Sequence, residues 1–174
     1  STNPALEGRS PPWVNTAAPS SRPPPRPAAT VLVVRDAPAL EVLMVRRNAG
    51  LAFGASAWVF PGGKVAQSDG DGEWRGLAPG GEEMAARALK VAAAREAFEE
   101  AGLVLAEDEA GRPASPSLCE RLSAEREAVE ADPSLFLRLM REHRLRLSLD
   151  RFVPFAHWIT PDFEPRRFDT HFFL

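Results

Sequence analysis

The chain has 174 residues, 44% of them hydrophobic, and a formal net charge of −3 at pH 7. This length and apolar content fit one domain with a single sizeable core. The negative charge argues against a nucleic-acid partner, which would favour a basic surplus, and no apolar run reaches the roughly 20 residues that span a membrane. Cys119 is the only cysteine, so no intrachain disulfide can form, and a reducing cytoplasm is the expected location. The sequence leaves the oligomeric state open.

Residues 1–28 are expected to form a proline-rich tail or linker, and the ordered domain is expected to span residues 29–174. The tail holds eight of the seventeen prolines. Proline fixes φ and removes a backbone donor, which favours an extended polyproline II chain over a sheet. A ligand for a proline-binding module is the alternative to a segment that lies along the surface.

Two strands, over residues 30–35 and 40–47, are expected to form a hairpin at the centre of a buried sheet, because both runs are rich in aliphatic residues. Arg46 and Arg47 lie at the exit of the second strand, where a guanidinium could hold a substrate phosphate through two hydrogen bonds. A solvated strand end is the alternative.

A third strand is expected over residues 58–60, and it leads to Gly62 and Gly63. We expect this pair to form a turn whose backbone closely approaches a phosphate or a metal, because neither residue has a Cβ. An ordinary tight turn is the alternative. Residues 68–81 follow; they are rich in glycine and aspartate and are predicted to form a loop.

A helix is expected over residues 82–101, and Gly102 provides its C-terminal stop. The apolar stripe of this helix recurs at helical spacing and includes Met84, Ala88, Val91 and Phe98. This stripe is expected to lie on the sheet.

Three carboxylates gather on another face of this helix. Glu96, Glu99 and Glu100 fall within one arc of about 100°, given the helical rotation of about 100° per residue. Such a cluster repels itself and destabilises an isolated helix, and a hard divalent cation with oxygen ligands is the usual way to offset the repulsion. Arg95 lies four residues before Glu99 and can brace it. A solvated acidic face is the alternative.

The rest of the chain is expected to add a strand, two helices and two further strands, over residues 103–106, 115–144, 151–160 and 167–174. Capping residues mark where the two helices begin: Ser115 precedes Pro116, and Asp132 precedes Pro133. This helical pair is either a substrate lid or plain packing. The three histidines show no zinc-type spacing and are expected to be structural: His143, His157 and His171.

The nine residues that begin at Arg95, Arg-Glu-Ala-Phe-Glu-Glu-Ala-Gly-Leu, resemble the second half of a Nudix box, whose pattern is G-x5-E-x7-R-E-U-x-E-E-x-G-U with U apolar. Upstream, Trp-Val-Phe-Pro-Gly-Gly-Lys-Val over residues 58–65 looks like the strand and glycine turn that open the box. Gly63 and Arg95 are thirty-two positions apart here, against fourteen in the pattern, so residues 68–81 resemble an insertion. Asp69 stands six residues after Gly63 in place of a glutamate, and no residue is assigned to the first box glutamate.

The interrupted box resembles one branch of the Nudix family, the peroxisomal coenzyme A and acyl-coenzyme A diphosphatase and its bacterial relatives. Trp-Ile-Thr-Pro over residues 158–161 and Pro-Arg-Arg-Phe-Asp-Thr-His-Phe-Phe over residues 165–173 look like its signature. The resemblance covers residues 29–174 and implies an α/β fold, a Nudix-type α/β/α sandwich around a mixed β-sheet. The chain stops inside the last expected strand, where that branch continues, which raises a C-terminally truncated fold as a hypothesis.

The resemblance implies hydrolysis of the pyrophosphate bond in a nucleoside diphosphate linked to another moiety, with coenzyme A or acyl-coenzyme A as the best substrate. The implied cofactor is Mg²⁺ or Mn²⁺, and its implied ligands are Glu96, Glu99, Glu100 and the main-chain carbonyl of Gly62. Glu96 is either a ligand or the general base, and Arg95 would orient Glu96 or Glu99. Hydrolysis of ADP-ribose, a dinucleotide or an oxidised nucleotide is one alternative, and a catalytically idle binding module is another.

The candidate substrate-binding residues are Arg46, Arg47 and Arg167. If the insertion is spliced into an intact site, the carbonyl of Gly62 should still lie near the three carboxylates. The inserted loop should then project from the rim of the cleft. Trp74, within that loop, would be either packed on the domain or free to meet substrate.

Overall fold

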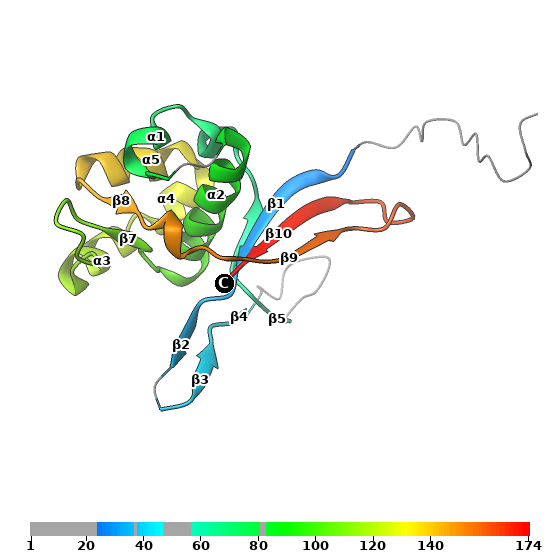
Figure 1. The fold of residues 1–174 in the computed structure, drawn as a ribbon, viewed down its shortest axis with the longest axis horizontal. Helices are drawn as coiled ribbons and strands as arrows, with labels where there is room; N and C mark the ends of the chain where they lie inside the picture. The colour runs from blue at the N-terminus through cyan, green and yellow to red at the C-terminus, as the bar shows by residue number, and fades with distance from the viewer. Residues whose placement is uncertain (1–23, 37, 47–56, 81–82) are drawn as a thin grey trace, which may run out of the picture.

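A computed structural model describes residues 24–36, 38–46, 57–80 and 83–174 and contains a four-stranded mixed sheet of order β6-β1-β10-β9 (Figure 1). The strands are β1 (Arg26–Val31), β6 (Gly62–Lys64), β9 (Pro154–Ile159) and β10 (Phe168–Phe173). The pairing of β1 with β10 is parallel, and the pairings of β1 with β6 and of β10 with β9 are antiparallel. The helices gather on one side, and the long strands reach away from them (Figure 1). The expected α/β fold around a mixed sheet is confirmed.

The ordered domain begins earlier than expected, because the last residues assigned to the tail belong to β1. Ala28 and Ala29 are 6% and 0% exposed, so these small side chains fit into the core. Pro27 is tolerated because it lies just outside the three residues of β1 that pair with β6, so its missing amide breaks no bond of that pairing, and its carbonyl accepts the amide of Val65 at 3.0 Å. A high proline content therefore gave the wrong boundary.

The expected hairpin forms, but its place at the centre of the sheet is wrong. It consists of β2 (Val34–Asp36) and β3 (Leu40–Val42), which form a separate two-stranded sheet. Every residue of these two strands is exposed, and Leu40 is 70% exposed. The central position is filled by β1 instead. In Figure 1 the hairpin hangs below the rest of the molecule.

Two more short pairs complete the strands. They are β4 (Val45–Arg46) with β5 (Trp58–Val59), and β7 (Ala106–Glu107) with β8 (Arg146–Leu147). The expected strand over residues 103–106 is thus shorter and later, and Gly62 and Gly63 lie in strand β6 rather than in a turn. The expected strands over residues 151–160 and 167–174 are confirmed by β9 and β10.

The long helix α2 (Met84–Ala101) matches the expected helix to within two residues. It ends at Gly102, whose φ of 70° is left-handed and whose amide donates to the carbonyl of Phe98 at 2.8 Å. Val91 and Phe98 are fully buried, as expected. Met84 is 64% exposed, because the first turn of the helix extends beyond the core.

Residues 115–144 form three helices rather than two: α3 (Pro116–Ser123), α4 (Arg126–Ala131) and α5 (Ser134–Glu142). The cap at Ser115 is confirmed, because its Oγ accepts the amide of Leu118 at 3.3 Å. Asp132 also acts near a helix start, where its carboxylate accepts the amide of Ser134 at 3.0 Å. The packing interpretation is favoured over a lid, because Phe136 and Met140 of α5 are buried in the core. The 3₁₀ turn η2 (Leu149–Arg151) then leads to β9.

The insertion is not a projecting loop; it forms the 3₁₀ turn η1 (Gln67–Gly70) and the short helix α1 (Trp74–Leu77). Trp74 is 1% exposed, and its ring centroid lies 5.8 Å from that of Phe136. Phe136 in turn lies 5.7 Å from Phe98 of α2. The indole of Trp74 donates to the carbonyl of Ser68 at 2.9 Å, which satisfies its one polar group. Of the two expected positions for Trp74, the packed one is confirmed.

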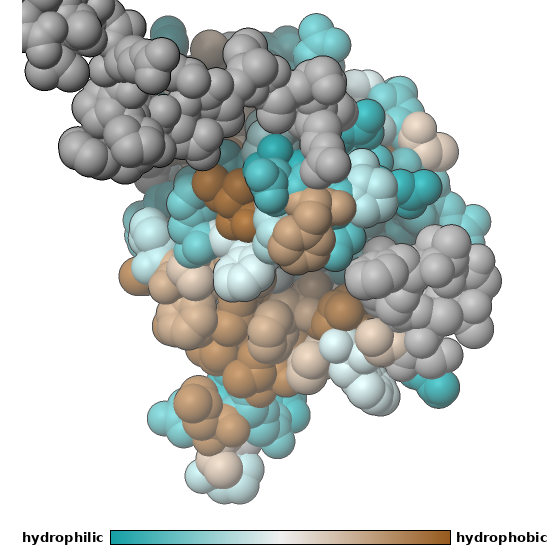
Figure 2. Space-filling view, turned by 90° about the vertical axis from the view of Figure 1, so that its right-hand side faces the viewer, coloured by the Kyte–Doolittle hydropathy of each residue, from teal (hydrophilic) through white to brown (hydrophobic). Residues whose placement is uncertain are grey.

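Several large apolar side chains remain exposed outside this core, and β9 carries three of them: Phe155, Trp158 and Ile159. Figure 2 shows apolar surface gathered just above the β2–β3 hairpin at the bottom of the view. Among the described residues, no helix combines the length and hydropathy that a membrane crossing requires.

Replacing Trp74 with alanine should lower the free energy of unfolding by about 3–5 kcal/mol, because it removes a buried indole and leaves a cavity. Urea denaturation followed by circular dichroism measures the change. Trp158→Ala is the matched control: Trp158 is 61% exposed, so its loss should cost less than about 0.5 kcal/mol. Equal losses from the two variants would contradict the packed position of the insertion.

Candidate functional site

The site is organised around Arg95, which is 2% exposed and lies on the last turns of α2. Its Nε and Nη2 donate to the two carboxylate oxygens of Asp69, both at 2.9 Å. Its Nη1 donates to Glu96 Oε1 at 2.9 Å and to Glu99 Oε1 at 2.8 Å, and Nη2 also donates to the carbonyl of Lys64 at 2.8 Å. These five hydrogen bonds match the five N–H donors of a guanidinium. The expected brace between Arg95 and Glu99 is confirmed.

Asp69 is the functional residue that the sequence interpretation left without a role. It is 1% exposed and belongs to η1, at the start of the insertion. Its carboxylate accepts the amide of Ala66 at 2.8 Å as well as the bidentate pair from Arg95. Its position six residues after Gly63 was the available signal, because that is the spacing of the first acidic residue in the box. Asp69 therefore occupies the place of the first box glutamate and anchors the arginine.

The glycines of β6 bring the backbone against the carboxylates of α2. The amide of Gly62 donates to Glu100 Oε2 at 3.1 Å. A Cβ added to Gly63 would overlap the carboxylate of Glu96, and one added to Gly62 would overlap Thr30 and the carbonyl of Ala29 on β1. Glycine is required at both positions by this close approach. The expected convergence of the glycine segment and the helix is confirmed, although the observed contact uses the amide of Gly62 rather than its carbonyl.

The C-terminal end of α2 is held by a residue that the sequence did not point to. Arg126, from α4, donates to the main-chain carbonyl of Glu99 through Nε at 3.0 Å and through Nη2 at 2.7 Å. The last carbonyls of a helix lack intrahelical partners, and a cation there also complements the helix dipole. Arg126 and Gly102 together fix the end of the helix on which the carboxylates stand.

Burial shapes the charge of this cluster. Burial raises the pKa of Glu96 to about 7; Arg95 opposes that shift, and the charge of Glu99 adds to it. Burial likewise raises the pKa of Glu99, against the hydrogen bond from Arg95. For Arg95, burial disfavours the charge, but the hydrogen bond and charge of Asp69 outweigh it, so its pKa is raised above the usual value. One buried positive charge thus faces an excess of carboxylates.

The residues present fit a hard divalent cation. Glu96, Glu99 and Glu100 offer carboxylate oxygens beside the backbone of Gly62 and Gly63, and an all-oxygen donor set is the one that Mg²⁺ and Mn²⁺ favour. Glu96 and Glu99 are largely buried, with side chains 13% and 7% exposed. A cation would offset the negative excess and favour the ionised form of the carboxylates.

Of the three arginines predicted to bind substrate, the two that the structure describes, Arg46 and Arg167, have other surroundings than this cluster. Arg46 is exposed and pairs across β4 and β5 with Trp58. The guanidinium of Arg167 donates to the carbonyl of Thr160 at 3.1 Å, across the turn between β9 and β10. Arg47 lies outside the described residues. Binding of substrate by any of the three stays a prediction.

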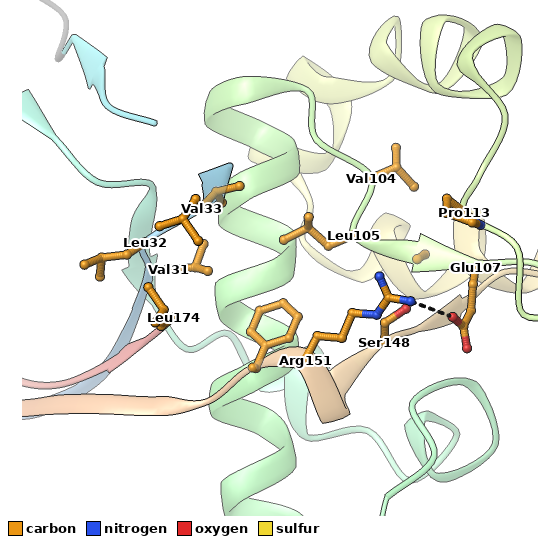
Figure 3. Close-up of a pocket in the computed structure, with 13 residues that line it drawn as sticks. Val31, Leu32, Val33, Val104, Leu105, Glu107, Pro113, Ser148, Arg151 and Leu174 are labelled. Carbon is orange, nitrogen blue, oxygen red and sulfur yellow. Dashed lines mark ion pairs between the residues drawn. The ribbon is translucent and has the colours of Figure 1, made fainter. Parts of the chain in front are cut away.

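An apolar cavity of about 320 Å³ lies at the end of β1 (Figure 3). Its lining includes Val31, Val33, Val104, Leu105, Phe152 and Leu174. Figure 3 shows Arg151 pointing toward Glu107 at its edge, and the two charged groups are 4.0 Å apart. Val31, one of the lining residues, donates its amide to the carbonyl of Pro61 at 3.0 Å, and the residue after Pro61, Gly62, donates its amide to Glu100.

Asp69→Asn should lower the free energy of unfolding by about 3 kcal/mol, because it removes one partner of a buried ion pair. This is the low end of the usual range, since Glu96 and Glu99 still face the guanidinium. Chemical denaturation measures this loss. Glu142→Gln is the matched control, because Arg138 and Glu142 form an exposed ion pair at 3.5 Å, and the stability of this variant should stay unchanged. An Asp69→Asn variant as stable as the parent would show that the buried pair is not an anchor.

The metal-free protein should lose stability as pH rises from about 4.5 to about 7, the window between the ordinary and the raised pKa of Glu96. Across this window the folded state holds more protons than the unfolded state, so the free energy of unfolding falls as pH rises. Glu96 contributes up to about 3.4 kcal/mol to this change, at 1.36 kcal/mol per pKa unit, and the raised pKa of Glu99 acts in the same direction. Urea denaturation in a chelator at several pH values measures it, with Glu96→Gln as the control that should remove most of the slope. The same slope in both proteins would contradict the assignment.

Comparison with known proteins agrees with this geometry. The family model described as the NUDT19 Nudix domain matches residues 82–174, more than half of the chain. Acyl-coenzyme A diphosphatase NUDT19 of Xenopus laevis is 28% identical over 181 residues, which cover 77% of this chain and 46% of that protein. The Homo sapiens protein of the same name is 29% identical over 201 residues, covering 91% and 51%. The chain thus spans about half the length of the curated relatives that it matches.

A solved structure gives the same assignment. The crystal structure of a NUDIX hydrolase from Alicyclobacillus acidocaldarius is similar to this chain with a TM-score of 0.65 and 32% sequence identity. The similarity covers 86% of this chain and 68% of that one. The chain therefore belongs to the Nudix hydrolase family, in the group described by the NUDT19 Nudix domain.

Proposed function

We propose that this protein hydrolyses the pyrophosphate bond of a nucleoside diphosphate linked to another moiety, with coenzyme A or acyl-coenzyme A as its substrate. The observation that carries the proposal is the set of buried carboxylates that Arg95 and Asp69 hold against the glycine strand. The name of the relatives, acyl-coenzyme A diphosphatase, supports this substrate class. We further propose that the protein works in the cytoplasm, which the single cysteine favours.

In this proposal Mg²⁺ or Mn²⁺ is held by Glu96, Glu99 and Glu100, with the carbonyl of Gly62 as a further ligand. When bound, such a cation neutralises the diphosphate and activates a water for in-line attack at phosphorus. The missing Cβ atoms of Gly62 and Gly63 let β6 lie directly against Thr30 and the carboxylate of Glu96. The glycine backbone and the carboxylates would therefore face the same cation.

Arg95 acts as a positioning residue. It holds Oε1 of Glu96 and Oε1 of Glu99, and Asp69 holds the guanidinium in turn, so the two carboxylates are fixed before substrate arrives. Such preorganisation lowers the cost of assembling the reacting groups. Glu96 is either a metal ligand or the general base. A carboxylate whose pKa is about 7 is matched to accepting a proton near neutral pH.

The apolar cavity at the end of β1 favours a substrate with an apolar arm. Its lining residue Val31 is hydrogen-bonded to Pro61, whose neighbour Gly62 contacts Glu100, and its lining is apolar apart from Glu107, Ser148 and Arg151. An acyl or pantetheine chain could enter it while the diphosphate lies at the carboxylates. ADP-ribose and dinucleotides lack such an arm, so they would leave the cavity unused. They remain the alternative substrates, and a catalytically idle binding module remains the alternative function.

Glu99→Gln and Glu100→Gln should each abolish metal-dependent turnover while the domain stays folded, because each removes a charged ligand. We expect turnover to fall by more than about 100-fold. Replacing a residue that only hydrogen-bonds to a metal ligand already costs roughly 10- to 100-fold. Removing one charge from a repelling cluster should leave the metal-free stability unchanged or slightly higher. Glu120→Gln, at an exposed position on α3, is the matched control. A Glu99 or Glu100 variant with near-parental activity in Mg²⁺ would show that the site is wrongly assigned.

The substrate is identified by a metal-dependent screen of coenzyme A, acyl-coenzyme A, ADP-ribose and NADH with this chain. Hydrolysis of coenzyme A at the pyrophosphate bond adds one water and yields 3′,5′-ADP and 4′-phosphopantetheine. Preference for long-chain acyl-coenzyme A over ADP-ribose would agree with use of the cavity. Turnover of ADP-ribose or NADH alone would establish the alternative substrate class. Binding of metal without hydrolysis of any of the four would favour a binding module.

A further inference from the structure

A second cluster of metal-ligating side chains lies on β9 and β10, apart from the carboxylates of α2. His157 of β9 is the register partner of His171 of β10, and Asp169 lies two residues before His171 on the same strand. Residues two apart in a strand point to the same face. The three side chains therefore converge on one face of the strand pair.

The polar atoms of the three side chains, which we call the histidine–aspartate triad, lie near one another. His157 Nε2 contacts Asp169 Oδ1, and His171 Nε2 lies 3.6 Å from the same oxygen. The two imidazole rings stack with centroids 4.2 Å apart. One ligand atom of each residue lies within 4.8 Å of the other two. Four ligands around a zinc ion at about 2.1 Å are roughly 3.4 Å apart, so small ring rotations would bring the three atoms to bonding distance.

The register also places the triad relative to the carboxylate cluster. His171 is the partner of Ala29 on β1, and Ala29 is the partner of Gly63 on β6. These positions form one row across the sheet, on the face where Gly63 meets Glu96 of α2. Two strand spacings separate His171 from Gly63, roughly 10 Å. The triad thus lies on the same face of the sheet as Glu96, but on the other side of β1 from Gly63, and it is separate from the carboxylate cluster.

We propose that His157, Asp169 and His171 form a second metal site, which binds a borderline-soft divalent cation such as Zn²⁺. Two imidazole nitrogens and a carboxylate oxygen are a donor set that zinc accepts, whereas Mg²⁺ favours oxygen ligands alone. The ligands stand on paired strands, which fix their spacing better than a loop would. Three protein ligands leave the fourth position of the cation open to water or to a substrate oxygen.

Access agrees with this assignment. The side chains of His157, Asp169 and His171 are 48%, 36% and 37% exposed, so a cation can enter from solvent without unfolding the sheet. This site could not be recognised from the sequence, because zinc sites are recognised by short spacings along the chain and His157 and His171 are fourteen residues apart. Strand register, not sequence spacing, brings them together.

Isothermal titration of the full chain with Zn²⁺, in excess Mg²⁺ to occupy the oxygen-rich site, tests the proposal. We expect one Zn²⁺ per chain and visible d–d bands of tetrahedral Co²⁺ when Co²⁺ replaces it. His157→Gln, His171→Gln and Asp169→Asn should each lower the Zn²⁺ affinity more than tenfold and remove the Co²⁺ bands. His143→Gln is the matched control, because His143 is an exposed histidine on α5's end, and its affinity should equal that of the parent.

Denaturation curves of each variant establish that it is folded, and the Glu99→Gln variant separates this site from the carboxylate cluster. Unchanged Zn²⁺ binding in Glu99→Gln agrees with the triad as the ligand set. Loss of Zn²⁺ binding in Glu99→Gln with retention in His171→Gln would overturn the proposal, as would the absence of Zn²⁺ binding by the parent chain. The readout is binding, so failure of the hydrolase proposal would leave this result unaffected.

Discussion

The guanidinium of Arg95 is the constraint on which the site depends. A buried guanidinium is costly unless its charge is paired and all its donors are used. Here the five donors are used by Asp69, Glu96, Glu99 and the carbonyl of Lys64. Those partners come from η1, α2 and β6, so one side chain ties the insertion, the helix and the glycine strand together. The inserted residues are part of the site because they supply the anchor.

The same cluster carries more negative charge than Arg95 can neutralise. Burial of Glu96 and Glu99 raises their pKa values, which means that the ionised, metal-ready state is destabilised in the absence of a cation. The ionised carboxylates that a cation would need therefore lower the stability of the metal-free protein. Such a conflict between stability and function is common at binding sites. The end of α2, held by Gly102 and by Arg126, keeps the carboxylates in position despite their repulsion.

The carboxylate cluster and the histidine–aspartate triad lie on the same face of the sheet. Gly63, Ala29, His171 and His157 form a row across β6, β1, β10 and β9, with Glu96 above the first of them. An oxygen-rich cluster stands at one end of this row and a nitrogen-rich triad at the other. These two donor sets suit different cations, because ligand softness decides selectivity as much as geometry does. The apolar cavity at the end of β1 adds a third kind of surface, and its lining residue Val31 is hydrogen-bonded to Pro61.

The helix α2, the arc of its carboxylates and the brace from Arg95 to Glu99 could be predicted from the sequence, because they depend on spacings of one helical turn. The close approach at the glycine pair could also be predicted, since it follows from the missing Cβ atoms. The pairing of Arg95 with Asp69 spans 26 positions, and only packing of the insertion decides it. Register alone joins His157 to His171. Contacts within a turn are encoded locally, whereas contacts across strands and segments exist only once the chain has folded.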